Sequence, residues 1–137
     1  MENLIDLFQA KTLTREFKTN TFTFKLRTLT ADELTDVLRR ADILATSEDT
    51  RVYIAKKITI AYALESVNGV DVLALPEINN LKASSEELKS ASKVDLMMRV
   101  LGTFDADTIT DLYNCYNKMI EENEASRQSL KKASVVR

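Results

Sequence analysis

The sequence predicts a mainly helical α+β fold with four to five helices, an N-terminal β-hairpin and a short Asn-Gly hairpin. The chain of 137 residues has only two glycines and one proline, so few positions interrupt a helix. Several long segments repeat their apolar residues at helical spacing. Strand-like alternation occurs in residues 21–27, and an Asn-Gly pair stands between two valines at 67 and 70.

Length and composition indicate one folded domain. The chain is 45% hydrophobic and 29% charged, with a net charge of −2, which is typical of a globular domain and not of a disordered segment. We therefore expect residues 1–125 to form a single helical domain, with the N-terminal hairpin at about 14–29. Residues 126–137 are polar and are expected to form a frayed C-terminal tail.

The N-terminal part contains the predicted hairpin. Phe22, Phe24 and Leu26 would share one face of a strand, and Thr19-Asn20 would form the turn that returns to residues 15–18. The first ten residues also carry apolar side chains, and they suit either a short amphipathic helix or a docking arm.

The central helices are predicted from their start signals. Thr30 and Glu33 form a capping box, with Leu29 and Leu34 at the staple positions, before a helix that reaches about Ala45. The apolar residues of this helix have the spacing of one inward face: Leu34, Val37, Leu38, Ala41, Leu44 and Ala45. A second helix is expected from about residue 51 to 66, with apolar residues on most sides.

The second half is predicted to begin with a connector at 73–83, because Leu75-Pro76 disfavours helix. Ser84 and Glu87 form another capping box, before a helix that would continue to Leu101 and stop at Gly102. The last helix would begin at Asp105.

No catalytic, cofactor-binding or metal-binding site is expected from the residue types. The chain has no histidine, which is the commonest general base, and its single cysteine, Cys115, suits a small and partly buried apolar position. Asp105, Asp107 and Asp111 lack the glycine and the closing glutamate of a calcium loop, and the first two suit the start of a helix. We therefore expect a protein that is not an enzyme.

Charge and hydropathy restrict the partners. No apolar run approaches the length of a membrane span, and the N-terminus lacks the features of a secretory signal. The N-terminal part is basic, but Phe22 and Phe24 alternate as core residues do, so nucleic acid is not the expected partner. The opposite charges of the basic N-terminal part and of the acidic segment 105–124 could instead steer partner binding or the formation of a homo-oligomer.

Five side chains are the candidate partner-binding residues. Methionine repacks easily and tyrosine is enriched at interfaces, so a stripe of both types suits an adaptable groove. The same stripe also suits a core, and both interpretations hold if part of it stays exposed. The residues are Met97, Met98, Tyr113, Tyr116 and Met119.

Three segments, in their order, resemble the tail assembly chaperones of long-tailed bacteriophages. The first is FKLRTLTADEL at 24–34, the second is LESVNGV at 64–70, and the third combines MRVLG at 98–102 with LYNCYNK at 112–118. The resemblance covers roughly residues 15–120. It implies a non-enzymatic protein of the host cytoplasm that binds the tape-measure protein and tail tube subunits during tail assembly. Many members of that family also have a longer form made by ribosomal frameshifting.

A second function stays open beside this one. Baseplate or tail-hub subunits of phage show similar patterns, and such a protein would persist in the virion tail. In either case the last helix is expected to supply the groove through Tyr113, Tyr116 and Met119. Replacing Tyr116 with Asp would then abolish client binding without unfolding the chain, whereas unfolding would place Tyr116 in the core.

Overall fold

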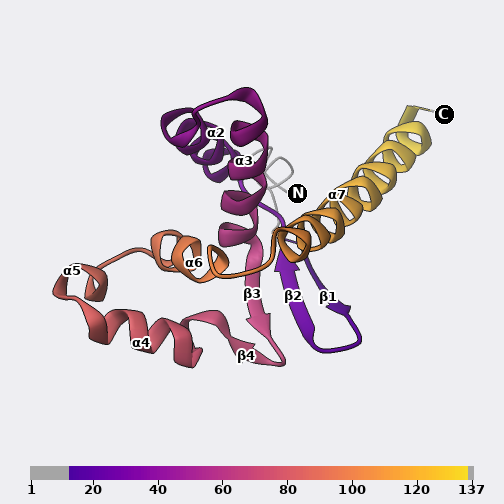
Figure 1. The fold of residues 1–137 in the computed structure, drawn as a ribbon. Coiled ribbons are helices and arrows are strands. Elements are labelled where there is room, and N and C mark those ends of the chain that lie inside the picture. Colours follow the sequence, from indigo (N-terminus) through magenta and orange to yellow (C-terminus); the bar gives the residue numbers. More distant parts are fainter. Residues whose placement is uncertain (1–12, 136–137) are drawn as a thin grey trace.

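The computed structural model describes the backbone of residues 13–135 and the side chains of residues 13–124, and in this range it confirms a mainly helical α+β fold (Figure 1). The described residues contain six α-helices, where four to five were predicted. The strands are β1 (Thr14–Lys18), β2 (Thr23–Arg27), β3 (Leu64–Val67) and β4 (Val70–Asp71). The helices are α2 (Ala31–Leu44), α3 (Glu48–Ala63), α4 (Pro76–Ser84), α5 (Glu86–Lys89), α6 (Lys93–Leu101) and α7 (Ala106–Val135), with a 3-10 turn at Val72–Ala74. The helix or arm expected in the first ten residues lies outside the described range.

Both predicted hairpins are present in one antiparallel sheet of order β1-β2-β3-β4. β1 and β2 pair from Thr14 with Arg27 to Lys18 with Thr23, around the predicted turn. Phe24 and Leu26 are buried on the face that the alternation predicted. At the second hairpin Asn68 and Gly69 have positive φ angles of 51° and 79°, which is what a two-residue turn of the favoured hand requires.

The capping box at the start of α2 is confirmed. The Thr30 hydroxyl accepts a hydrogen bond from the Glu33 backbone N–H, and the Glu33 carboxylate accepts one from the Thr30 N–H. The apolar face predicted for this helix is only partly buried, however. Val37 and Ala41 are covered, whereas Leu34, the predicted staple residue, and Leu38 and Leu44 are exposed. The reason is that α2 packs mainly against one neighbour, α3.

The end of the second predicted helix was wrong. It was expected to reach Ser66, but α3 ends at Ala63, and Leu64–Val67 forms β3 and pairs with β2. Tertiary pairing decides this boundary, because Leu64–Val67 contains no glycine or proline that would exclude either helix or strand.

The segment between the second hairpin and α6 also differs from the prediction. The expected connector at 73–83 contains α4, which starts at Pro76, where the missing N–H of proline costs nothing. The helix expected from Ser84 to Leu101 is two helices: Ser85 caps α5, and Ser92 caps α6. Ser84 itself belongs to the end of α4, so the predicted capping box of Ser84 and Glu87 does not form.

The core lies where α3 meets the sheet, α6 and the first half of α7. Ile58, Ile60 and Ala61 of α3 are fully buried there, as the prediction of a central helix implied. α4–α6 extend to one side of α3 and α7 to the other (Figure 1). The backbone of α7 continues to Val135, into the segment for which a tail was expected, and its second half projects away from the other helices.

Candidate functional site

The structure divides the five predicted partner-binding residues into two groups. Met97, Tyr116 and Met119 are buried in the core and form no open groove, so the prediction for these three is corrected. Burial follows from the packing of α6 and α7 on α3, which covers these side chains. Met98 and Tyr113 are half-buried and remain partly accessible.

Tyr116 shows the consequence most clearly. Its side chain is 8% exposed, and its hydroxyl accepts a hydrogen bond from the Leu29 backbone N–H at 3.4 Å. The neighbouring Tyr113 ring lies 6.3 Å from the Tyr116 ring and has the Lys56 ammonium 5.6 Å from its centre. Tyr116 therefore joins α7 to the strand–helix junction at Leu29, and it is a structural residue.

An open groove lies between α2 and α6, on the side where α5 also approaches. Its volume is about 570 Å³, which is in the usual range for binding clefts of roughly 300–1,000 Å³. Met98 is the one predicted partner-binding residue that lines it. The full lining is Arg40, Leu44, Ile58, Glu87, Leu88, Ala91, Asp95, Met98 and Arg99.

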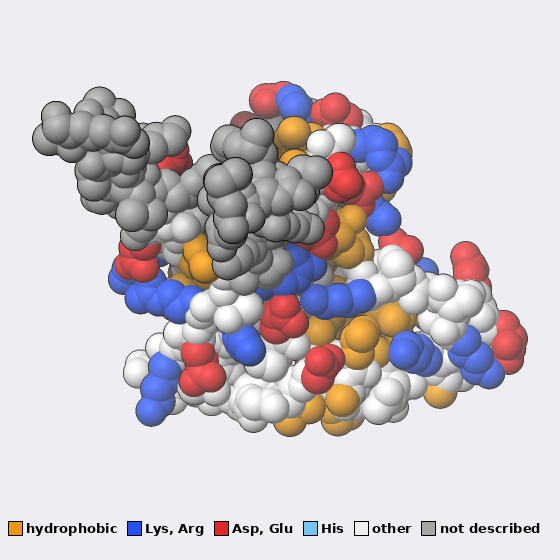
Figure 2. All heavy atoms as spheres, turned by 180° about the vertical axis from the view of Figure 1, so that it is seen from behind, with side chains coloured by type: hydrophobic (Ala, Val, Ile, Leu, Met, Phe, Trp, Pro, Cys, Tyr) orange, Lys and Arg blue, Asp and Glu red, His pale blue; other side chains and the backbone are white. Residues whose placement is uncertain are grey.

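The groove continues along the outside of α2. A hollow of about 320 Å³ is lined by Arg39, Arg40, Ile43 and Leu44, so it shares two residues with the groove. Ile43 is 69% exposed and Leu44 is 55% exposed. Seen from behind, hydrophobic side chains reach the surface between the α2–α3 pair at the top and the helices below, with basic side chains beside them (Figure 2). Exposed apolar side chains with a polar rim mark interaction surfaces.

Sequence reasoning missed Ile43 and treated Leu44 as core. Leu44 shares the predicted inward face of its helix. The sequence alone does not reveal that the C-terminal end of this helix is left uncovered. Ile43 offers a signal, because it lies on the opposite side of the helix from Leu34 and directly precedes Leu44. An apolar residue outside the inward face, next to Arg39 and Arg40, indicates a surface for binding protein.

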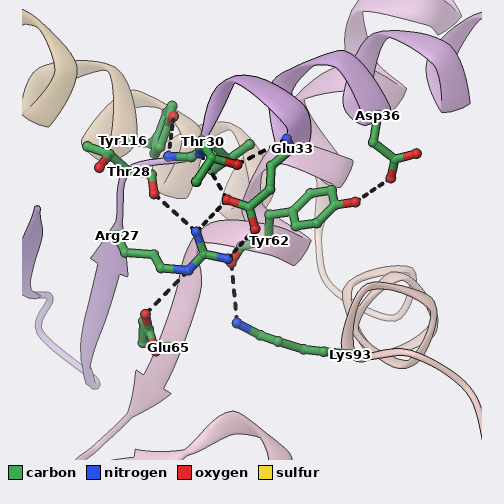
Figure 3. A network of polar contacts seen from close by, with 10 residues as sticks. Arg27, Thr28, Thr30, Glu33, Asp36, Tyr62, Glu65, Lys93 and Tyr116 are labelled. Carbon is green, nitrogen blue, oxygen red and sulfur yellow. Dashed lines mark hydrogen bonds and ion pairs between the residues drawn. The ribbon is translucent and has the colours of Figure 1, made fainter. Parts of the chain in front are cut away.

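A set of ionic contacts holds α2 against α3 and α6 beside the groove. Arg40 binds Asp36 at 2.7 Å on its own helix and Asp95 of α6 at 2.8 Å. The Tyr62 hydroxyl of α3 donates a hydrogen bond to Asp36, and the Lys93 ammonium donates to the Tyr62 carbonyl at 3.2 Å. Figure 3 shows Tyr62 and Asp36 pointing toward each other from the two helices.

These contacts fix the charge of the groups. The hydrogen bond from Tyr62, with help from Arg39 and Arg40, lowers the pKa of Asp36 to about 2. Burial and the same carboxylate raise the pKa of Tyr62 to about 12. The hydrogen bond from Arg40 lowers the pKa of Asp95, and burial lowers the pKa of Lys93. At neutral pH the cluster therefore joins the charged Asp36 and Asp95 carboxylates to Arg40 and to a neutral Tyr62 hydroxyl, and its role is to position helices.

A second ionic cluster joins the sheet to α2 (Figure 3). The Arg27 guanidinium of β2 makes two hydrogen bonds of 2.7 Å to the Glu33 carboxylate and lies 3.4 Å from the Glu65 carboxylate of β3. The hydrogen bond from Arg27 lowers the pKa of Glu33 to about 2. Glu33 thus caps α2 and also anchors it to the sheet.

The remaining reactive and acidic residues show no assembled chemistry in the described part of the chain. Cys115 is half-buried, and burial raises the pKa of its thiol, so little thiolate forms at neutral pH. Among residues whose side chains are described, no three His, Cys, Asp or Glu side chains come together as metal ligands would. The described helices also include none that is long and apolar enough to cross a bilayer.

Comparison with protein-family models, with curated proteins and with solved structures returned no significant match to this chain. The site must therefore be interpreted from its own geometry. A groove with apolar and charged lining residues, whose walls are joined by an ion pair, is suited to binding an amphipathic helix of another protein.

Proposed function

We propose that this protein is a phage tail assembly chaperone that binds a helical segment of the tape-measure protein, or of tail tube subunits, in the groove between α2 and α6. The groove carries the proposal, because it is an open surface that combines apolar with charged side chains and its walls are joined by charged contacts. The resemblance of the segments at 24–34, 64–70 and 98–118 to that family supports the identity of the client. The protein would act in the host cytoplasm during infection.

The proposed binding mode places the apolar stripe of a client helix against Leu44, Leu88 and Met98. Met98 suits this position because its flexible side chain adapts to different client residues. Arg99 and Glu87 provide opposite charges along the groove, so they would orient the helix more than they strengthen its binding. Such a surface shields apolar stripes of a client until the tube surrounds it.

The first test compares purified virions with infected-cell lysate by quantitative mass spectrometry. A chaperone is abundant in the lysate and absent from virions, because it leaves after assembly. Persistence in virions at a fixed small copy number would instead identify a subunit of the baseplate or tail hub, and the chaperone proposal would fail.

The second test changes the groove. Leu44→Asp places a charge on the exposed floor and should weaken binding of overlapping tape-measure peptides by about tenfold or more, equivalent to about 1.4 kcal/mol. Binding is measured by fluorescence anisotropy, and folding by circular dichroism.

The matched control is Leu38→Asp. Leu38 lies on the same helix, and its exposed fraction of 50% is similar to the 55% of Leu44, but it does not line the groove. It should leave peptide binding within twofold of the unchanged chain. If both variants lost peptide affinity equally, or if neither lost any, the peptide would not bind in the groove.

A further inference from the structure

A second pocket lies apart from the groove, between the sheet and the start of α7. α7 begins next to β2 and β3 (Figure 1), and the pocket between them has a volume of about 450 Å³. Most of its lining is apolar, and two of the side chains are aromatic rings, Phe22 and Phe104. The lining residues are Phe22, Leu64, Val67, Phe104, Asp105, Thr108 and Leu112.

The pocket is open at Phe104. This side chain is 38% exposed, although a phenylalanine gains most from full burial. The pocket volume is large enough for one or two side chains of a partner, and aromatic walls favour a further ring in stacked or edge-on contact.

The edge of this pocket is acidic. Asp105 lines it, and Asp107 and Asp111 are exposed on the same end of α7. None of the three forms an ion pair with another residue whose side chain is described. The helix dipole offsets charge in the first turn, but Asp111 lies beyond it. This end of the molecule therefore keeps an excess of negative charge, unlike the groove, where Asp36 and Asp95 are paired with Arg39 and Arg40.

We propose that this pocket is a second protein-binding site, which receives an aromatic side chain of a partner segment with a lysine or arginine beside it. The ring would lie between Phe22 and Phe104, and the basic group would face Asp105. The proposal follows from the apolar lining and the uncompensated carboxylates, and it stands independently of the groove and its client.

The experiment uses the full chain and two short probes, N-acetyl-Phe-Lys-amide and N-acetyl-Phe-Glu-amide. Methyl signals of Leu64, Val67 and Leu112 report on the pocket by NMR at low salt. The lysine probe should shift these signals and bind at least threefold more tightly than the glutamate probe. Added salt should reduce that preference, because it screens exposed charges.

Two variants separate shape from charge. Thr108→Phe fills the pocket and should abolish the shifts with both probes. Asp105→Asn keeps the pocket open and should remove the preference for lysine while shifts persist. Asp49→Asn, an exposed acid in the first turn of α3, is the matched control and should change neither result. If Thr108→Phe does not fold, Asp105→Asn still decides the charge prediction.

Three outcomes would overturn the proposal. The first is the absence of shifts at the three methyl groups. The second is equal binding of the two probes. The third is that the same signals shift with protein concentration alone, because the pocket would then be occupied by a second copy of the chain.

Discussion

At the scale of single residues, position relative to α3 decides which apolar side chains are buried and which stay accessible to a partner. Met97 and Met98 are adjacent in the sequence, yet Met97 is fully buried and Met98 lines the groove. The spacing of a stripe identifies a face of a helix, but it does not identify what covers that face. Adjacent residues on α6 therefore have different roles that only the packing reveals.

Tyr116 provides the prediction at this scale. Tyr116→Asp would place a charge in the core and should cost about 3 kcal/mol or more of stability, so the chain should unfold. Tyr116→Phe loses only the long hydrogen bond from Leu29 and should cost about 1 kcal/mol or less. Thermal unfolding followed by circular dichroism checks both. A folded Tyr116→Asp that has lost client binding would restore the hypothesis of a groove on α7.

The half-buried neighbour is the control for this change. Tyr113→Asp introduces the same charge about one turn earlier on α7. At this half-buried position, water and the Lys56 ammonium can reach the new carboxylate. Its effect on the unfolding temperature should be clearly smaller than that of Tyr116→Asp. Similar effects would mean that burial is not the cause.

At the scale of elements, α2 buries little for its length. Only Val37 and Ala41 of its fourteen residues are buried, so the hydrophobic contribution to its docking is small. Polar contacts compensate: Glu33 binds Arg27 of β2, while Asp36 and Arg40 bind Tyr62 and Asp95. These contacts leave the apolar Ile43 and Leu44 available to a partner while the helix itself stays fixed.

The two glycines of the chain allow an element-level prediction. Gly69 has a φ of 79° in the turn between β3 and β4, and Gly69→Ala should destabilise the chain by about 1 kcal/mol through backbone strain alone, since nothing lies within 4 Å of the new methyl group. Gly102 ends α6 with a φ of −63°, so Gly102→Ala needs no left-handed conformation. Its added carbon would lie 3.3 Å from the Met98 carbonyl oxygen, and the cost should stay below about 0.5 kcal/mol.

Urea unfolding of both variants checks this order. A larger loss for Gly102→Ala would show that the close approach of the Met98 carbonyl, and not the backbone angle, limits substitution at these positions. The comparison also tests the predicted glycine stop, because a left-handed cap at Gly102 would make its replacement as costly as that of Gly69.

Some local signals in the sequence predicted their elements correctly, although the Ser84 and Glu87 pattern did not. The capping box of Thr30 and Glu33 and the Asn68-Gly69 turn depend on neighbouring residues, and both form. The end of α3 depends on β2, which is some forty residues earlier and pairs with Leu64. The groove depends on α2 and α6 being held together by Arg40 and Asp95, which are distant in the sequence. Neither could be predicted from spacing.

At the scale of the whole molecule, the ionic clusters reinforce a helix that the hydrophobic core holds by few residues. The core joins α3, α6, α7 and the sheet and includes only Val37 and Ala41 of α2, while Glu33 and Asp36 attach α2 through polar contacts to Arg27 and Tyr62. Stability should therefore respond to pH mainly through α2. The groove, which has α2 as one wall, should open or lose its shape under the same conditions.

The sign of the pH effect follows from the two carboxyls. Their pKa values fall from 4.5 for Glu33 and 3.8 for Asp36 to about 2 for each on folding. A lowered pKa stabilises the folded state above the ordinary value, and this stabilisation is lost as pH falls toward the lowered value. The chain should thus have constant stability from pH 7 to about 5 and lose stability steeply from there to pH 2, and α2 should detach first.

Glu33→Gln isolates one of these contributions. The variant should be less stable than the unchanged chain by about 2 kcal/mol at pH 7, because Arg27 loses its charged partner. When the free energy of unfolding is plotted against pH, the two chains should converge near pH 2, where Glu33 is half protonated. Glu86→Gln removes a carboxylate from an exposed pair with Lys89 and should change stability little at any pH. Urea unfolding from pH 7 to pH 2 measures all three chains. Parallel curves for Glu33→Gln and the unchanged chain would show that the loss at pH 7 comes from the helix cap and not from the charge, and α2 would then owe its position to packing on α3.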